Sequence, residues 1–83
     1  MRYTYILRCA DDTLYTGITT DLERRIREHN HSPLGASYTR GRRPVTLLRS
    51  QEHESRSDAS KAEYHIKHLS REEKFSLIQK EEG

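Results

Sequence analysis

Residues 15–29 have the sequence YTGITTDLERRIREH. The first part, through Thr19, is rich in β-branched and aromatic residues and is typical of a strand. Thr20 and Glu23 have the spacing of a capping box, which predicts that a helix begins at Asp21. The stretch therefore joins a strand directly to a basic helix. It also places a phenol, arginines and histidine close together in the sequence.

A second strand precedes this stretch. Residues 3–9, YTYILRC, are again β-branched and aromatic, and the turn residues ADD separate them from the strand at 13–19. We therefore expect a β-hairpin with a three-residue turn. In that register Tyr5 and Tyr15 share one face as diagonal neighbours. Gly17 leaves the surface beside them bare, so that another backbone or a ligand can approach closely.

The predicted helix has one inward side. At about 100° per residue, four residues fall within one arc about 100° wide. They are Leu22, Arg25, Ile26 and His29. The other charged residues lie outside this arc, namely Glu23, Arg24, Arg27 and Glu28, and we expect Arg24 and Arg27 to face water. An arginine on the buried side needs a partner or a function, unless its stem packs while its head reaches solvent.

The rest of the chain predicts one strand and two helices. Residues 30–44 are a long loop punctuated by proline and glycine, 45–50 are a third strand, and 51–55 are a polar, exposed connection. We expect the next helix to begin at Ser57 or Asp58 and to end near Leu69.

Two features of the last helices bear on function and fold. In the first of them the apolar stripe consists of Ala59, Ala62, Ile66 and Leu69. Glu63 then lies on the flank of the buried face. Ser70 and Glu73 form a capping box that begins the last helix. The expected class is therefore α+β, with elements in the order β-β-α-β-α-α.

Composition limits what this chain can be. Its 83 residues are 31% hydrophobic and 34% charged, which predicts a single domain over residues 1–83 with a thin core. We expect that core to be one sheet face or one helix layer packed on another. The lone Cys9 excludes an internal disulfide or a cysteine zinc site and favours the cytoplasm. We expect no signal peptide, because the apolar run in residues 1–9 is too short, and no stretch approaches the length of a membrane span.

Basic residues concentrate in the middle of the chain. Residues 20–49 contain seven arginines and three acids, whereas residues 50–83 contain eight acids and six bases. The loop carries four residues suited to nucleic-acid backbone and bases, Tyr38, Arg40, Arg42 and Arg43. A solvated, partnerless basic loop is the alternative interpretation.

Five side chains remain as candidates for chemistry: Tyr5, Tyr15, Arg25, His29 and Glu63. A phenol or imidazole can move a proton, an arginine can stabilise a phosphate, and a single carboxylate can hold one divalent cation. Together they match a one-metal phosphodiesterase. Taken singly, each also has a structural explanation, such as an ion pair between Glu63 and Arg25. The histidine pairs 29/31 and 65/68 lack the cysteines or carboxylates of a zinc site.

The order of these residues resembles the GIY-YIG nuclease superfamily, in its small stand-alone bacterial branch. The segment 15–17 followed by Asp21, Leu22 and Arg25 resembles the second half of the signature, and 3–5 resembles the first half. The resemblance extends through GASYTRGRRP to the run ending at Glu63. It implies a small three-stranded antiparallel sheet flanked by helices.

The resemblance also implies the roles of the residues. Tyr5 and Tyr15 would be the signature tyrosines, and one of them would assist deprotonation of the attacking water. Arg25 would hold the scissile phosphate, His29 would occupy a catalytic helix position, and Glu63 would be the sole ligand of Mg²⁺ or Mn²⁺. The expected reaction is endonucleolytic hydrolysis of DNA, in repair or processing.

Two departures from the family pattern leave an alternative. Tyr3 and Thr4 replace the glycine and isoleucine of the first half of the signature, and no separate DNA-binding domain is attached. The alternative is a non-catalytic nucleic-acid-binding module that uses the arginine-rich loop. The sequence does not identify protein partners.

Overall fold

The computed structural model describes residues 1–32 and 37–82. Within them the chain forms β1 (Arg2–Arg8), β2 (Leu14–Thr19), α1 (Leu22–His31), α2 (Ser37–Arg40), β3 (Thr46–His53), α3 (Arg56–Lys67) and α4 (Arg71–Glu82). The predicted class and order are confirmed, with α2 added inside the segment predicted to be a loop. Residues 33–36 of that loop lie outside the described residues.

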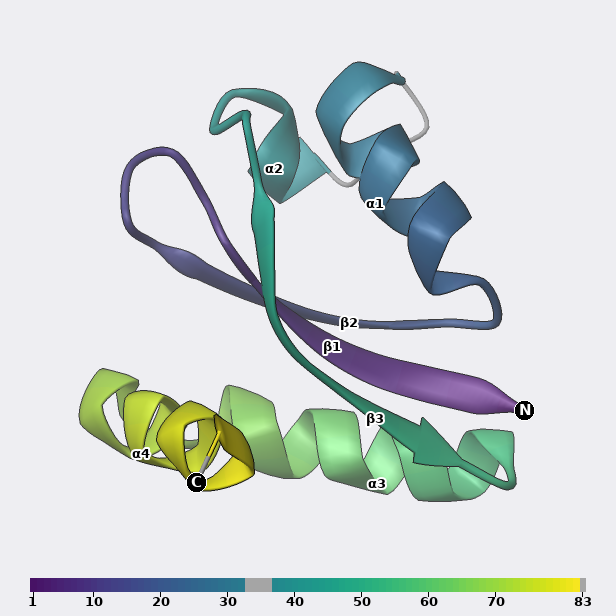
Figure 1. Ribbon diagram of the computed structural model, residues 1–83. Coiled ribbons are helices and arrows are strands. Elements are labelled where there is room, and N and C mark those ends of the chain that lie inside the picture. Colours follow the sequence, from purple (N-terminus) through teal and green to yellow (C-terminus); the bar gives the residue numbers. More distant parts are fainter. Residues whose placement is uncertain (33–36, 83) are drawn as a thin grey trace.

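The three strands form one antiparallel sheet in the order β2-β1-β3. Helices α1 and α2 lie on one face of it, and α3 and α4 lie on the other (Figure 1). The central strand β1 is therefore covered on both faces, and its residues 4–7 are all buried. The expectation of a core on one sheet face was wrong, because successive side chains of β1 point to opposite faces and each face acquires its own helices.

Each face of the sheet has a small apolar cluster. On the α1 side the buried members are Tyr5, Leu7, Cys9 and Val45, with Tyr15, Leu22 and Ile26 packed against them. On the α3 and α4 side the buried members are Ile6, Ile66 and Ile78, with Leu14, Leu48, Phe75 and Leu77 around them. Alternation along β1 divides the limited apolar content between two thin cores, so each large side chain contributes to only one of them.

The hairpin has the predicted register. Tyr5 pairs with Gly17 and Leu7 pairs with Tyr15, which makes the two tyrosines diagonal neighbours. The turn is closed by a hydrogen bond from the Cys9 amide to the Thr13 carbonyl, at 2.8 Å. Both signature tyrosines therefore project toward α1 from adjacent strands.

Side-chain caps set the helix boundaries. Helix α1 begins one residue later than predicted, because Asp21 rather than Thr20 accepts the amide of the third following residue, at 3.1 Å. The Thr19 hydroxyl accepts the Asp21 amide, which holds the chain extended for one more residue. Helix α3 begins at Arg56, one or two residues before the predicted start at Ser57 or Asp58, because Ser55 is its cap.

Two other expectations concern β3 and α4. The polar residues 51–53 belong to β3 and pair with residues 2–4 of β1, so the predicted exposed connection is shorter than expected. Their polar side chains fit an edge strand, one side of which faces solvent. The capping box of α4 is confirmed, since Ser70 and Glu73 exchange side-chain to amide hydrogen bonds of 2.9 and 3.2 Å.

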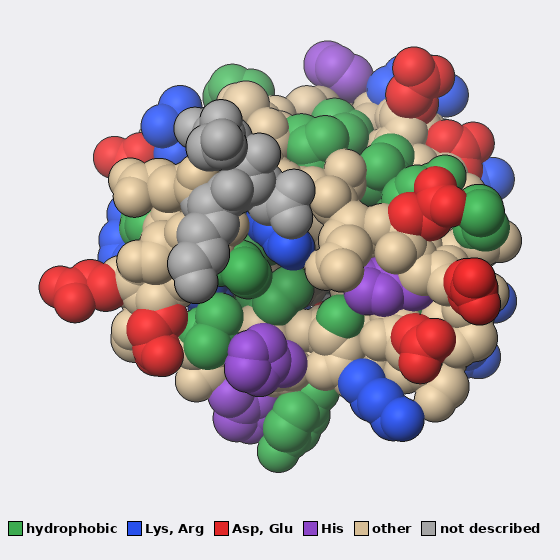
Figure 2. Space-filling model, turned by 60° about the horizontal axis from the view of Figure 1, so that its bottom comes forward, with side chains coloured by type: hydrophobic (Ala, Val, Ile, Leu, Met, Phe, Trp, Pro, Cys, Tyr) green, Lys and Arg blue, Asp and Glu red, His purple; other side chains and the backbone are tan. Residues whose placement is uncertain are grey.

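The surface formed by α3 and α4 carries acidic side chains and histidines spread among other residue types (Figure 2). This agrees with the acidic balance of the C-terminal part of the sequence. Among the described residues, no helix combines the length and apolar character needed to cross a membrane.

The hairpin turn yields a stability prediction. Asp12 has a φ of 67°, the left-handed region, and is the one non-glycine residue with positive φ in the described part of the chain. Aspartate tolerates this conformation better than most residues but still at a cost. We predict that Asp12→Gly raises the free energy of unfolding by about 0.5–1 kcal/mol, measured by urea denaturation.

The matched control is Ala10→Gly in the same turn, where φ is not positive. There glycine only adds freedom to the unfolded chain, so stability should fall by about 0.5–1 kcal/mol. A loss of stability in both variants would mean that positive φ at Asp12 carries no cost.

Candidate active site

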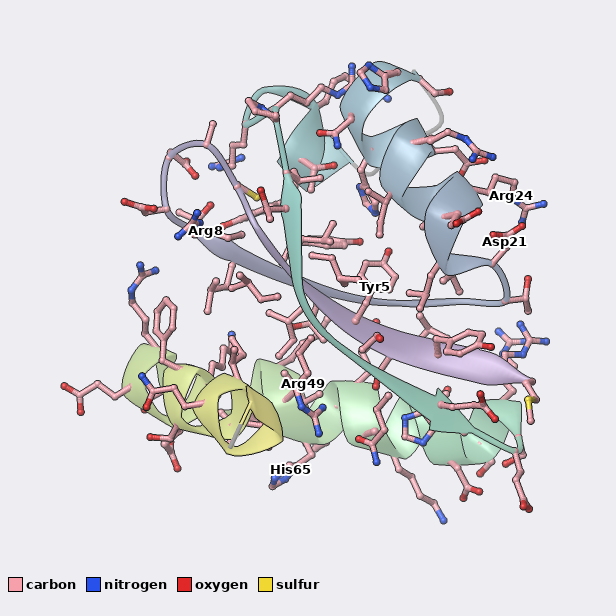
Figure 3. The ribbon with its side chains drawn as sticks, viewed as in Figure 1. Tyr5, Arg8, Asp21, Arg24, Arg49 and His65 are labelled. Atoms are coloured by element: carbon pink, nitrogen blue, oxygen red, sulfur yellow. The ribbon has the colours of Figure 1, made fainter. Side chains whose placement is uncertain are left out.

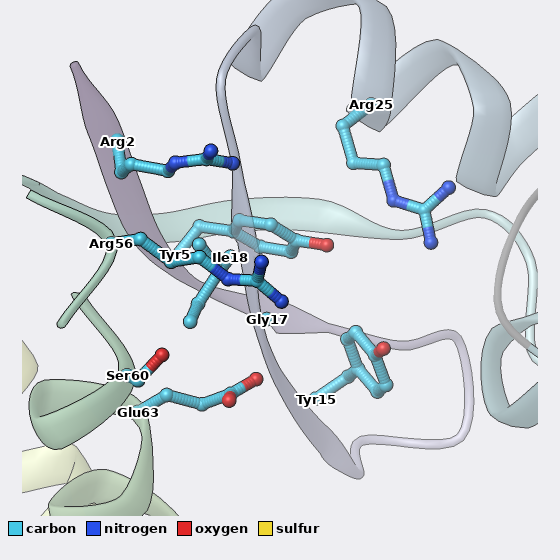
Figure 4. A pocket seen from close by; sticks show the side chains of 9 residues that line it. All are labelled: Arg2, Tyr5, Tyr15, Gly17, Ile18, Arg25, Arg56, Ser60 and Glu63. Atoms are coloured by element: carbon cyan, nitrogen blue, oxygen red, sulfur yellow. The ribbon is translucent and has the colours of Figure 1, made fainter.

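A pocket lies at the β2 edge of the sheet, where side chains of α1 from one face and of α3 from the other line the same surface. Its volume is about 340 Å³. The lining residues are Arg2, Tyr5, Tyr15, Gly17, Ile18, Arg25, Arg56, Ser60 and Glu63 (Figure 4). The structure thus brings four of the five predicted chemical residues to one concave surface, and His29 is absent from the lining.

The Tyr5 ring is packed so closely on Gly17 that a side chain at position 17 would clash with it. A Cβ placed on Gly17 would lie 2.4 Å from the Tyr5 Oη and 2.6 Å from its Cζ. The ring of Tyr5 therefore lies directly across the bare backbone of its cross-strand partner. Gly17 leaves room, as predicted, but the group that occupies the room is the phenol of Tyr5.

His29 is behind Tyr5, in a buried hydrogen-bonded chain. Its Nε2 lies 2.9 Å from the Tyr5 Oη, and its Nδ1 lies 2.7 Å from the Thr39 Oγ1. All three side chains are buried. Figure 3 shows Tyr5 between the sheet and α1, whereas Arg24 on the same helix points outward. His29 therefore positions Tyr5 and does not itself face the pocket.

Burial sets the protonation states of Tyr5 and His29. It raises the pKa of Tyr5 to about 12, although the nearby Arg25 guanidinium acts to lower it. It lowers the pKa of His29 to about 4, and the positive charge of Arg25 adds to this effect. Tyr5 is therefore a neutral phenol and His29 a neutral imidazole near pH 7. One ring nitrogen of a neutral imidazole donates a hydrogen bond and the other accepts one, which suits two hydroxyl partners.

Contacts between aromatic rings connect His29 to the basic loop. The rings of Tyr15 and His29 are 5.2 Å apart, and those of Tyr15 and Tyr38 are 5.7 Å apart. The Arg42 guanidinium lies over the Tyr38 ring, 4.2 Å from its centroid. Tyr38, which was predicted to stack on bases, thus also supports Tyr15. Tyr38 as a whole residue is 39% exposed at this position.

Arg25 is on the inward side of α1, as the helical phase predicts. Its side chain is 25% exposed, and one guanidinium nitrogen lies 2.9 Å from the Glu28 carboxylate. Glu28 was placed outside the inward arc, and this ion pair holds its side chain at 22% exposure. Arg24 and Arg27 are exposed, as predicted. Arg25 is thus held by one carboxylate while its guanidinium remains in the pocket wall.

Glu63 faces Arg25 across the pocket (Figure 4). Its side chain is 26% exposed and lies 3.3 Å from Lys67, one helical turn further along α3. Glu63 and Arg25 therefore do not form the structural ion pair that was the alternative, because each has a different charged partner. An exposed pair such as Glu63–Lys67 contributes little and is readily replaced, so the carboxylate remains accessible to a cation.

The arginines of the loop make different contacts. Arg42 bonds to the Asp11 carboxylate at 2.9 Å and to the Tyr38 carbonyl at 2.7 Å. Arg43 donates to the carbonyls of Glu28, His29 and Ser32 and so caps the C-terminal end of α1. Arg40 is exposed. Arg43 thus has a structural role that its place in an arginine cluster did not indicate.

Several residues of the site were missed in the sequence. Thr39 gives no sequence signal, because its place is set by the packing of α2 against α1. Arg56 and Ser60 could have been found, since residues 56, 60 and 63 have the i, i+4, i+7 spacing of one helix face. Misplacing the start of α3 at Ser57 or Asp58 left Arg56 outside the helix.

No group of three or more histidine, cysteine or carboxylate side chains suited to a metal occurs within residues 1–32 and 37–82. In the histidine pair 65/68, His68 interacts with Tyr64 instead. Its Nδ1 lies 2.8 Å from the Tyr64 carbonyl, and the two ring centroids are 4.1 Å apart. Among the residues that line the pocket, Glu63 is the one carboxylate and therefore the candidate ligand for a cation.

The fold and the pocket agree with comparisons to known proteins. A family model of the GIY-YIG catalytic domain matches residues 1–76. The chain belongs to this family. As a GIY-YIG domain it is nuclease-like, and nucleic acid is the class of substrate that the family indicates. Nucleases of the family generally use a divalent metal.

Relatives of this GIY-YIG domain are small proteins. It is 55% identical over 80 residues to the UPF0213 protein DP2720 of Desulfotalea psychrophila, covering 96% of this chain and 73% of that protein. It is 51% identical over 78 residues to a UPF0213 protein of Halobacterium salinarum, covering 94% of this chain and 100% of the relative. The solution NMR structure of the UPF0213 protein BH0048 from Bacillus halodurans superposes with a TM-score of 0.62 at 48% identity, covering 95% and 84% of the two chains.

The close contact at Gly17 gives a prediction about the site's rigidity. Gly17→Ala should lower the free energy of unfolding by about 1–3 kcal/mol, because Tyr5 is buried and bonded and cannot move aside freely. Urea denaturation measures the change. Gly41→Ala is the control, since a Cβ there meets nothing within 4 Å and its stability should be unchanged or slightly higher. Equal effects at both glycines would contradict the described position of Tyr5.

The pKa of His29 gives a pH dependence with a definite sign. Between pH 4 and 6.5 the unfolded chain binds a proton on this imidazole that the folded chain does not bind. The free energy of unfolding should therefore fall by about 3 kcal/mol as the pH drops through this window.

The measurement is urea unfolding at several pH values for the wild type and for His29→Gln, which cannot titrate. The pH slope should flatten in this variant. His31→Gln, an exposed histidine on the same helix, should keep the wild-type slope. A His29→Gln profile parallel to the wild type would show that burial of this imidazole does not control acid stability.

Proposed function

We propose that this chain is a metal-dependent endonuclease that hydrolyses a phosphodiester bond of DNA, in repair or processing. The observation that carries the proposal is the convergence of Arg25 and Glu63 on opposite walls of one pocket, with Tyr5 and Tyr15 between them. A binding module has no need for a half-buried carboxylate facing an arginine.

Arg25 is the proposed phosphate ligand. Its guanidinium is fixed by Glu28 on one side, which reduces the side-chain freedom lost on binding. N–H groups that neither Glu28 nor Tyr5 engages can donate to the non-bridging oxygens of the scissile phosphate. These bonds become stronger as negative charge develops in the transition state.

The two tyrosines have different accessibility, which suggests different roles. Tyr5 is buried to 1% exposure, and its hydroxyl is bound to His29. With a pKa of about 12 it is a hydrogen-bond donor and acceptor of fixed position. Tyr15 is half-buried and lines the pocket. We assign Tyr15 to orient and assist deprotonation of the attacking water, and Tyr5 to hold the phosphate oxygens or the water in place.

Glu63 is the proposed ligand of Mg²⁺ or Mn²⁺. A lone carboxylate at an open pocket fits these cations, which keep several waters and take phosphate oxygens as further ligands. A bound cation would neutralise charge on the phosphate oxygens. Ser60, one turn before Glu63 on the same wall, can accept or donate a hydrogen bond to such waters.

The loop supplies the proposed contact with the DNA strand beyond the pocket. Tyr38 and Arg40 are exposed there, and Arg42 is half-buried over the Tyr38 ring. Phosphates can bind these arginines, and a base can approach the open edge of Tyr38. Arg43 acts through α1, because its guanidinium is used in capping that helix.

Cleavage assays on a panel of single-stranded, duplex, flapped and branched DNA test the proposal. With Mg²⁺ or Mn²⁺ the wild type should nick at least one substrate, and a chelator should stop the reaction. Glu63→Gln and Arg25→Ala should each lower the rate by about 10²–10³. Arg24→Ala is the matched control, because this neighbouring arginine is 58% exposed and outside the pocket. It should cut at nearly the wild-type rate.

Two results would overturn the assignment. Equal traces of cleavage by the wild type and Glu63→Gln would identify a contaminating nuclease. Salt-dependent DNA binding with no cleavage on the whole panel would favour the non-catalytic binding module instead.

A further inference from the structure

Two arginines of the pocket are left over by the proposed reaction. Arg2 enters it from the first residue of β1, and Arg56 from the first residue of α3. Figure 4 shows both guanidinium groups extending from the side of the pocket that carries Ser60 and Glu63, with Arg25 on the opposite side. The three positive groups therefore come from three different elements, β1, α1 and α3.

Arg2 and Arg56 differ from the other arginines near the site in their partners. Arg25 is paired with Glu28, Arg42 with Asp11, and Arg43 with carbonyl groups. For Arg2 and Arg56, the described residues 1–32 and 37–82 provide no hydrogen-bond or ion-pair partner. A guanidinium has five donors and no acceptor, so two of them directed into one pocket favour an anion there.

The charge of the pocket exceeds what one phosphodiester needs. Its lining contains three arginines and one carboxylate, while Tyr5 is a neutral phenol. A cation on Glu63 would make the excess larger. A single scissile phosphate carries one negative charge and already has Arg25 as a ligand. The surplus positive charge is that of Arg2 and Arg56, on the side of the pocket away from Arg25.

We propose that Arg2 and Arg56, with the Ser60 hydroxyl, bind a second phosphate of the same nucleic-acid strand, adjacent to the phosphate bound by Arg25. This inference rests on the proposed function and specifies its substrate. The strand must continue past the scissile bond on the side of α3. A cut at the last linkage on that side is disfavoured, and the site acts within a strand rather than at its end.

Binding measurements test this subsite without requiring cleavage. The probe is a short fluorescein-labelled single-stranded oligothymidylate, titrated with Glu63→Gln protein at several salt concentrations. Adding Arg56→Gln should weaken binding by about tenfold and lower the slope of log K against log salt by about 0.7, the value for one lost phosphate contact on a single strand. Arg2→Gln should behave in the same way.

Arg27→Gln is the matched control. This arginine is exposed on α1 and outside the pocket, so its loss should leave affinity and salt slope nearly unchanged. Circular dichroism of each variant establishes that it is folded. Because Arg56 is exposed at the first turn of α3, its replacement leaves both apolar clusters intact.

A second experiment locates the phosphate on the substrate. Oligonucleotides with one neutral methylphosphonate linkage at successive positions should bind the Glu63→Gln protein about tenfold less tightly when the neutral linkage is next to the scissile position. In the protein that also carries Arg2→Gln and Arg56→Gln, this linkage should cause no further loss. If the neutral linkage and the two arginine substitutions each weaken binding and their effects add, the proposed subsite is wrong.

Failure of the subsite can be distinguished from failure of the proposed function. If Arg25→Gln weakens binding and lowers the salt slope while Arg2→Gln and Arg56→Gln do neither, the second subsite is wrong and the phosphate site of the proposed function stands. If none of the three changes binding, the pocket does not bind nucleic acid and both proposals fail.

Discussion

The buried phenol of Tyr5 is the constraint on which the rest of this structure depends. Its ring lies across Gly17, and its hydroxyl is bound to His29, which is bound in turn to Thr39. One side chain thereby ties the hairpin, α1 and α2 together. In a chain with two thin cores, a buried polar chain with every member satisfied adds specificity that apolar packing alone would not provide.

The position of the pocket follows from that constraint and from the sheet edge. Tyr5 fixes the distance of α1 from the sheet, which brings Arg25 to the β2 edge. On the opposite face, the apolar stripe of α3 packs under β1 and turns Glu63 toward the same edge. The site forms at the β2 edge of the sheet, because groups from both faces can meet at an edge without a strand between them.

Sequence patterns determined the local parts of this arrangement because those parts depend on short-range geometry. Alternation in the hairpin placed Tyr5 and Tyr15 on one face, and helical phase placed Arg25 and His29 inward. The patterns were less accurate at helix starts. Asp21 and Ser55 cap their helices, although neighbouring residues were equally good candidates by type.

The sequence by itself determined the class, the order of elements, the family and the phase of Tyr5, Tyr15, Arg25 and Glu63. Only the tertiary structure decided which side chains line the pocket together. It moved His29 behind Tyr5, assigned Arg43 to the end of α1, and added Arg2 and Arg56 to the pocket. The physical reason is that periodicity specifies the direction of a side chain within its own element. Partners, burial and protonation depend on the elements packed against it, which lie far away in the chain.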